Sequence, residues 1–175
     1  MDMAKLELIR DDITRLDVGA IVNAANSSLM GGGGVDGAIH CAAGSELLAE
    51  CMKIAAERKD IPGGPCPAGE AVITGAYNLP CKHVIHTVGP VWQGGDQGEA
   101  ETLASCYRNS LLLAAENGIT SIAFPNISTG VYGYPKDKAA AVAIETVRKT
   151  LNETPNIQRV LFVCFDDENY ELYQE

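Results

Sequence analysis

The sequence has no long apolar run and no cluster of basic residues. No stretch approaches the ~20 apolar residues that a membrane-spanning helix requires. The start, Met-Asp-Met-Ala-Lys, lacks the basic, apolar and small-residue order of a secretory signal. We therefore expect a cytoplasmic protein with no membrane partner.

Basic residues are scarce: 13 Lys and Arg stand against 23 Asp and Glu, which gives a formal net charge of −10. Binding to a nucleic-acid backbone relies on basic patches, so nucleic acid is not expected as the main partner. A small anionic ligand stays compatible with this charge, because backbone N–H groups can hold a phosphate without cationic side chains.

Metal-ligand spacing is also missing. The six cysteines include no C-x-x-C pair, and four of them lie in apolar or helical surroundings, where free Cys acts as a small buried hydrophobe. His40, His83 and His86 show neither metal-ligand spacing nor a paired nucleophile, so we interpret them as structural. The sequence predicts no metal and no cofactor.

What is present is the length and the patterning of one α/β domain, residues 1–175, expected to be a monomer. Apolar spacing and stop signals predict helices over about Gly37 to Arg58, around Leu103 to Ala115 with a stop at Asn117-Gly118, and from Pro135 to Leu151. Strands that alternate with such helices predict a largely parallel sheet covered on both faces, a three-layer architecture. The predicted strands are Lys5 to Arg10, Ala20 to Val22, Glu70 to Ala76, His83 to Val88, Ser121 to Pro125 and Arg159 to Phe165.

Two glycine-rich segments each follow a predicted strand and precede a predicted helix. The first is the run Gly31-Gly32-Gly33-Gly34, and the second is Ile127 to Pro135 (ISTGVYGYP). Consecutive glycines cost conformational entropy, but they let the backbone approach a ligand closely, and a following helix N-terminus favours an anion. Together the two loops suit a diphosphate, although a flexible loop and an ordinary strand-to-helix turn remain the alternatives. Ile61 to Gly69 has the composition of a plain surface loop.

Four polar residues are candidates for contacts near these loops. Asn23 and Asn26 either tie loops together or present their amides to sugar hydroxyls. Asp36, just past the glycine run, either positions a water or hydroxyl for catalysis or stabilises a helix N-terminus. Asp12 either reads the edge of an adenine, together with the backbone of Ile13, or caps a turn at Thr14 to Asp17.

Five ordered motifs together resemble those of a MacroD-type macrodomain, and the resemblance covers almost the whole chain. These motifs are Asp11-Asp12-Ile13-Thr14, Ile21 to Asn26 (IVNAAN), Leu29 to His40 (LMGGGGVDGAIH), His86 to Pro90 (HTVGP) and Phe124 to Pro135 (FPNISTGVYGYP). The resemblance implies a three-layer α/β/α fold with a mixed, mostly parallel sheet of about six strands. It also implies binding of ADP-ribose, and hydrolysis of mono-ADP-ribose from acidic protein side chains or deacetylation of O-acetyl-ADP-ribose.

The same resemblance implies a role for each site residue. Asp12 with Ile13 would take the adenine, and Phe165 would lie near its ring. Asn26 and Asp36 would address the distal ribose and the attacking water, with room for that water at Gly133. The diphosphate would be held by Gly31, Gly32, Gly33, Gly34, Val35, Ser128, Thr129, Gly130, Val131 and Tyr132, and Asn23 is expected among the ligand-binding residues.

Two positions depart from the family pattern. Asp11 stands where the family usually has Gly; Asp tolerates a left-handed backbone better than most residues, but its charge beside Asp12 bears on the strength of adenine recognition. Asn126 replaces a small residue and adds hydrogen-bonding capacity without charge.

Three functions of different class follow. The first is a hydrolase of ADP-ribosyl esters, and the second is a module that binds ADP-ribose without turnover. The third, binding of RNA or regulation of a protein partner, is disfavoured by the net charge.

Overall fold

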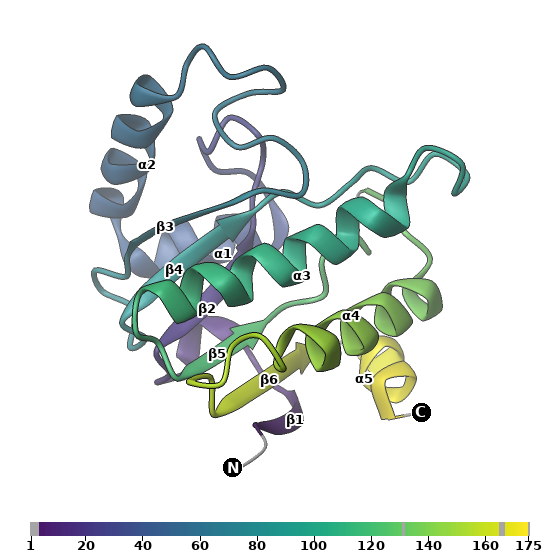
Figure 1. Cartoon of the computed structure of the whole chain (residues 1–175). Helices are drawn as coiled ribbons and strands as arrows, with labels where there is room; N and C mark the ends of the chain where they lie inside the picture. The colour runs from purple at the N-terminus through teal and green to yellow at the C-terminus, as the bar shows by residue number, and fades with distance from the viewer. Residues whose placement is uncertain (1–3, 131, 165–166, 175) are drawn as a thin grey trace.

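A single mixed sheet organises the part of the chain that the computed structural model describes, residues 4–130, 132–164 and 167–174. Its strand order is β1-β6-β5-β2-β4-β3, and only the edge strand β3 runs antiparallel to its neighbour (Figure 1). The strands are β1 (Lys5–Arg10), β2 (Ala20–Ala24), β3 (Ala71–Gly75), β4 (His83–Thr87), β5 (Ser121–Phe124) and β6 (Arg159–Cys164).

Helices cover both faces of this sheet. One face packs against α1 (Gly34–Ala43) and α2 (Ser45–Glu57), and the other against α3 (Glu99–Glu116), α4 (Lys136–Thr150) and α5 (Asp167–Gln174) (Figure 1). Alternate residues of β2 point to opposite sides: Ile21 joins the core under α1 and α2, whereas Ala20 and Val22 join the core under α3 and α4. The expected three-layer α/β/α fold with a mixed, mostly parallel sheet is thus confirmed.

The helix expected from Gly37 to Arg58 is in fact two helices. Gly44 separates α1 from α2 with a φ of 91°, a backbone conformation that residues with a Cβ rarely adopt. The apolar spacing runs through both helices and conceals this break. Helix α3 has the stop expected at Asn117, and Pro135 stands one residue before α4.

Two elements lie outside the predicted helices and strands. A short 3-10 turn, η1 (Ile13–Arg15), follows β1 and is capped by Asp12, as the capping interpretation of Asp12 expects, whereas α5, after β6, was not predicted. Helix α5 is so polar that the spacing of its few apolar residues does not indicate a helix in the sequence. Its Tyr173 nevertheless packs against Phe162 of β6.

The cysteines are free, and five of them are buried, while Cys41 is exposed. Burial raises the pKa of the Cys66 thiol to about 12 and that of Cys51 to about 11, so both stay protonated thiols at neutral pH.

In the described ranges no helix is long and apolar enough to cross a membrane.

Candidate functional site

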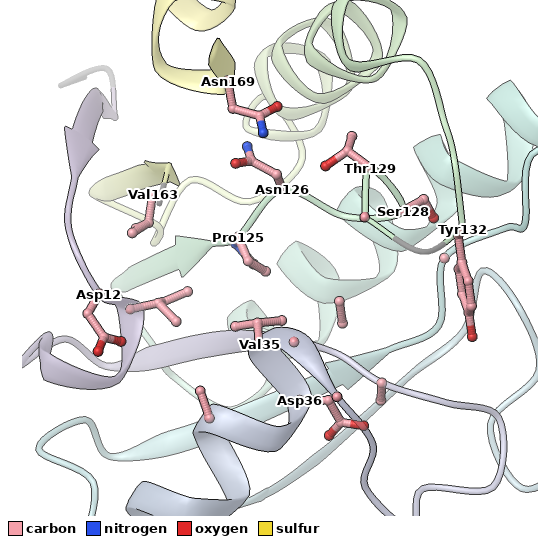
Figure 2. Close-up of a pocket in the computed structure, with 18 of the residues that line it drawn as sticks. Asp12, Val35, Asp36, Pro125, Asn126, Ser128, Thr129, Tyr132, Val163 and Asn169 are labelled. Carbon is pink, nitrogen blue, oxygen red and sulfur yellow. The ribbon is translucent and has the colours of Figure 1, made fainter. Parts of the chain in front are cut away.

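A cavity of about 740 Å³ opens at the carboxyl ends of the parallel strands. Residues just after β1, β2, β4 and β5 meet there: Asp12, Asn26, Gly89 and Asn126 all line it. Parallel α/β sheets bind ligands at this edge, because loops and helix N-termini converge on it. Figure 2 shows the cavity with Asp12 near one end and Asp36 with Tyr132 at the other.

The first glycine loop leads directly into α1. Gly33 is the N-cap, and Gly33, Gly34 and Val35 line the cavity. A side chain would not fit in two places: a Cβ on Gly32 would lie 2.6 Å from Asn26 Nδ2, and one on Gly37 would lie 2.6 Å from the Gly32 carbonyl oxygen. The loop is therefore packed against α1, which directs the positive end of the helix dipole at the cavity.

The second glycine loop forms the opposite wall with Ser128, Thr129, Gly130 and Tyr132. Ser128 has a φ of 68°, and its carbonyl oxygen accepts a hydrogen bond from Tyr134 N at 2.9 Å. A Cβ on Gly89 of the neighbouring loop would lie 2.1 Å from Ser128 Oγ. A strained serine that needs a glycine beside it is a feature of functional loops more often than of plain turns.

Asp36 is the buried acid of the site and is 3% exposed. Its Oδ1 accepts a hydrogen bond from Asn23 Nδ2 at 2.8 Å and lies 3.3 Å from His40 Nε2. Its Oδ2 is buried and makes no hydrogen bond to the residues that the structure describes. One carboxylate oxygen is thus held by Asn23, and the other is buried without a hydrogen bond to the described residues, in a residue that contributes to the cavity lining.

Asn26 connects the two glycine loops. Its Nδ2 donates to the Gly31 carbonyl oxygen at 2.8 Å, and its Oδ1 accepts from the Tyr132 hydroxyl at 3.3 Å. Tyr132 is held in turn, because its carbonyl oxygen accepts from Trp92 N at 2.8 Å. Because both polar atoms of the Asn26 side chain are hydrogen-bonded, the side chain keeps its orientation without a ligand. A fixed orientation suits a residue that positions a substrate.

Asp12 lies at the other end of the cavity. Its Oδ1 accepts from Thr14 N at 3.0 Å and from Thr14 Oγ1 at 2.7 Å, so it caps η1 and also lines the cavity. Asp12 N donates to Asp11 Oδ1 at 2.7 Å, and Asp11 has no left-handed backbone. The backbone at Asp11 therefore does not require a glycine. The charge of its side chain is what still distinguishes it from the Gly that is usual in the family.

The structure brings most of the expected site residues to the cavity. Asn23, Gly31, Gly32 and Gly133 do not line it, and Asn23 is completely buried beneath Asp36. Val131 and Phe165 lie outside the described residues. The expected residues that line the cavity are Asp12, Ile13, Asn26, Gly33, Gly34, Val35, Asp36, Ser128, Thr129, Gly130 and Tyr132.

Some cavity residues were not foreseen. Asn169 of α5 reaches the cavity beside Asn126, and Val163 at the end of β6 adds an apolar surface (Figure 2). Asn169 was missed because α5 was missed. His40, interpreted from the sequence as structural, lies against Asp36. Because residues four apart on a helix are neighbours, the spacing of Asp36 and His40 could have predicted this contact.

No group of three or more His, Cys, Asp or Glu side chains in the described part of the chain is arranged to hold a metal ion. The cavity is lined by the N-terminus of α1 and by the second glycine loop, together with three carboxylates and three side-chain amides: Asp11, Asp12, Asp36, Asn26, Asn126 and Asn169. Such an arrangement suits a diphosphate that carries a sugar.

Comparison with known proteins agrees with this geometry. The family model "Macro domain" matches residues 22–143. This chain belongs to the macro domain family. The resemblance that the sequence motifs indicate is thereby confirmed.

The similarity to known relatives extends over nearly the whole of this chain. An O-acetyl-ADP-ribose deacetylase of Klebsiella pneumoniae is 59% identical over 168 residues, which is 96% of this chain and 93% of that protein. The solved Oceanobacillus iheyensis macrodomain with ADP has a TM-score of 0.93 and 46% identity, and the match covers 99% of this chain and 90% of that one. A Trypanosoma brucei macrodomain in complex with ADP-ribose has a TM-score of 0.86 and 43% identity, covering 97% of this chain and 67% of that one.

Proposed function

We propose that this macrodomain binds ADP-ribose and hydrolyses ADP-ribosyl esters, acting as an O-acetyl-ADP-ribose deacetylase, as a hydrolase of mono-ADP-ribose on acidic protein side chains, or as both. One observation carries the proposal above all: a buried carboxylate, Asp36, contributes to the cavity lining, with one oxygen fixed by Asn23 and the other without a hydrogen bond to the described residues. A reader of ADP-ribose without turnover has no need for such an acid beside an anionic ligand.

The ligand is proposed to lie along the cavity. Gly33 to Val35 and Ser128 to Gly130 line it, and their backbone amides would hold the diphosphate. Asp12 and Ile13 would bind the adenine, as the family resemblance implies. The distal ribose would then reach Asp36, which lies at the other end (Figure 2), and Asn26, whose side chain contacts Tyr132 there. The solved relatives that contain ADP and ADP-ribose support this choice of ligand.

The reaction needs a positioned water and no covalent enzyme intermediate. For the acetyl ester, water attacks the ester carbonyl, the bond from that carbon to the ribose oxygen breaks, and acetate and ADP-ribose leave. For a modified protein, water attacks the anomeric carbon or the ester carbonyl, and the products are ADP-ribose and a free carboxylate. Asp36 would orient the ribose or the water through Oδ2, and Asn26 would fix the sugar hydroxyls, so the gain comes mainly from positioning.

The test is a turnover assay of the whole chain on two substrates. O-acetyl-ADP-ribose and a protein carrying mono-ADP-ribose on glutamate are incubated separately, and acetate and free ADP-ribose are measured over time. The proposal expects ADP-ribose from at least one substrate, together with calorimetric binding that is tighter for ADP-ribose than for AMP or ATP. Tight binding with no product from either substrate would instead identify a reader module.

A further inference from the structure

A row of buried polar side chains lies under the site and crosses three neighbouring strands. Asn23 of β2 stands opposite His86 of β4 in the parallel register, and Thr74 of β3 is the diagonal neighbour of His86. The exposed fractions are 0% for Asn23, 1% for His86 and 3% for Thr74. Buried polar groups are costly without partners, so a row of three calls for a physical reason.

The three side chains form a continuous contact path that ends at Asp36. Asn23 Nδ2 lies 2.8 Å from Asp36 Oδ1 and 3.1 Å from His86 Nδ1, and His86 Nε2 lies 2.9 Å from Thr74 Oγ1. Thr74 Oγ1 also donates to the Gly75 carbonyl oxygen at 3.0 Å. Neither Asn23, His86 nor Thr74 lines the cavity, so none of them touches a ligand there.

The chemistry of the groups fixes the direction of every bond in the path. A carboxylate only accepts, so the amide nitrogen of Asn23 faces Asp36, and its second hydrogen points at His86 Nδ1. Nδ1 must then accept, which places the imidazole proton on Nε2. Nε2–H donates to Thr74 Oγ1, whose own hydrogen goes to the Gly75 carbonyl oxygen. The path thus has a consistent arrangement, in which the Thr74 hydroxyl also lies 3.5 Å from the Val84 carbonyl oxygen and Asn23 Oδ1 is buried without a partner among the described residues.

Burial keeps the imidazole neutral, as this arrangement requires. Desolvation, and to a smaller degree the neighbouring His40, lowers the pKa of His86 to about 3. The titratable groups around Asp36 are His40 on its own helix, His86 on β4 and Cys51 on α2, whose thiol pKa is raised to about 11 by burial and by Asp36. Asn23 Nδ2, at 2.8 Å, is the nearest donor to Asp36 Oδ1, and His40 Nε2 lies 3.3 Å from the same oxygen.

We propose that Thr74, His86 and Asn23 are positioning residues, whose hydrogen-bond order holds Oδ1 of Asp36 and leaves Oδ2 to act on the ribose or water. This inference rests on the proposed hydrolase function and adds three residues to it. The hydroxyl of Thr74 determines the tautomer of His86, and this tautomer determines the orientation of the Asn23 amide. The amide in turn fixes the position of Asp36 Oδ1.

Thr74→Val tests the path at its far end, because valine keeps the shape and removes only the hydroxyl. His86 Nε2–H then loses its hydroxyl acceptor and retains the weak acceptor Cys51 Sγ at 4.0 Å, which favours the Nδ1–H tautomer. The Asn23 amide must turn its oxygen toward that proton, and the same oxygen then opposes Asp36 Oδ1. We expect kcat to fall about tenfold or more while the Kd for ADP-ribose stays within about threefold.

Two further variants distinguish positioning from simple damage to the core. Thr74→Ser restores the hydroxyl and should recover kcat to within about threefold of the wild type. Thr154→Val is the matched control, because Thr154 is 1% exposed and its hydroxyl donates a hydrogen bond to the Thr150 carbonyl oxygen. It lies between α4 and β6, and three strands separate β6 from β3 in the sheet. Thr154→Val should lose stability without losing kcat. Equal kcat values for Thr74→Val and Thr154→Val would overturn the proposal.

The imidazole tautomer gives a readout that does not depend on turnover. Nitrogen-15 NMR of the wild type should show neutral His86 with its proton on Nε2 between about pH 5 and pH 8, and Thr74→Val should move the proton to Nδ1. A wild-type Nδ1–H tautomer or an imidazolium would refute the path even in an active enzyme. A wild type that releases no product would refute the proposed function. The hydrogen-bond path would then be tested by the tautomer of His86 alone, in the wild type and in Thr74→Val.

Discussion

The two ends of the cavity are built in different ways. At the Asp36 end, side chains are held by partners far along the chain: Asn23 with Asp36 and His86, and Asn26 with Tyr132. At the Asp12 end, the side chain is held by its own neighbours, Asp11 and Thr14. One end depends on the complete tertiary fold, and the other on a local turn.

This difference matches what each end is proposed to do. Orientation of a reacting ribose and a water needs groups fixed to a fraction of an ångström, which rigid strands and a helix provide. Recognition of an adenine needs an acceptor and an amide of the right spacing, which one 3-10 turn supplies. Substitutions at the Asp36 end should therefore change turnover, and substitutions at the Asp12 end should change affinity.

Asp36→Asn should give the largest effect. The amide is isosteric and can still accept from Asn23, but it loses the charge that orients water. Turnover should fall by about 10²–10⁴-fold, and the Kd for ADP-ribose should change by less than about threefold. Steady-state kinetics and calorimetry measure the two quantities, and the exposed Asp60→Asn is the control. Full activity of Asp36→Asn would remove this residue from the reaction.

Asp12→Asn should show the opposite pattern. Loss of the charged acceptor should raise the Kd for ADP-ribose about tenfold, while kcat at saturating substrate stays near the wild-type value. The nearby exposed Asp17→Asn serves as the control. A fall in kcat without a change in Kd would contradict the division between the two ends.

Acid should destabilise the Asp36 end through His86. The pKa of His86 is lowered by burial from 6.5 to about 3, so below pH 6.5 the unfolded chain binds a proton that the folded chain does not. The free energy of unfolding should thus decrease as pH falls from 6.5 toward 3, at up to about 1.4 kcal/mol per pH unit from this group. Urea unfolding across this range measures the slope. His86→Gln should have a smaller slope, and an unchanged slope would show that His86 is not buried neutral.

Asp11→Asn should give the smallest effect. Asp11 is exposed, lines the cavity and carries a charge of the same sign as the diphosphate. Its removal should tighten ADP-ribose binding about twofold at low salt and less at high salt, because exposed charges are screened. Calorimetry at two salt concentrations measures this, and weaker binding would mean that the bond from Asp12 N to Asp11 Oδ1 matters more than the charge.

The sequence was informative wherever a local pattern had a local cause. Six strands, both glycine loops and the acid after the first loop could be located, because alternation, left-handed glycines and helix starts are properties of neighbouring residues. The break at Gly44 could not, since the apolar spacing of α1 continues into α2.

The candidate site was less predictable where its contacts are distant in sequence. Whether Asn23 touches a ligand or another side chain depends on β2 lying beside β4, which no local pattern states. The role of His86 likewise appears only when Thr74 of the antiparallel edge strand is placed next to it. Asn169 reaches the cavity only because α5 packs back toward β1 and β6.

The most direct test of the account is a crystal structure of this macrodomain soaked with ADP-ribose. The account predicts the diphosphate between the amides of Gly33 to Val35 and those of Ser128 to Gly130, the adenine at Asp12, and the distal ribose within hydrogen-bonding distance of Asp36 Oδ2. A ligand bound in the reverse direction, or with its distal ribose away from Asp36, would contradict it.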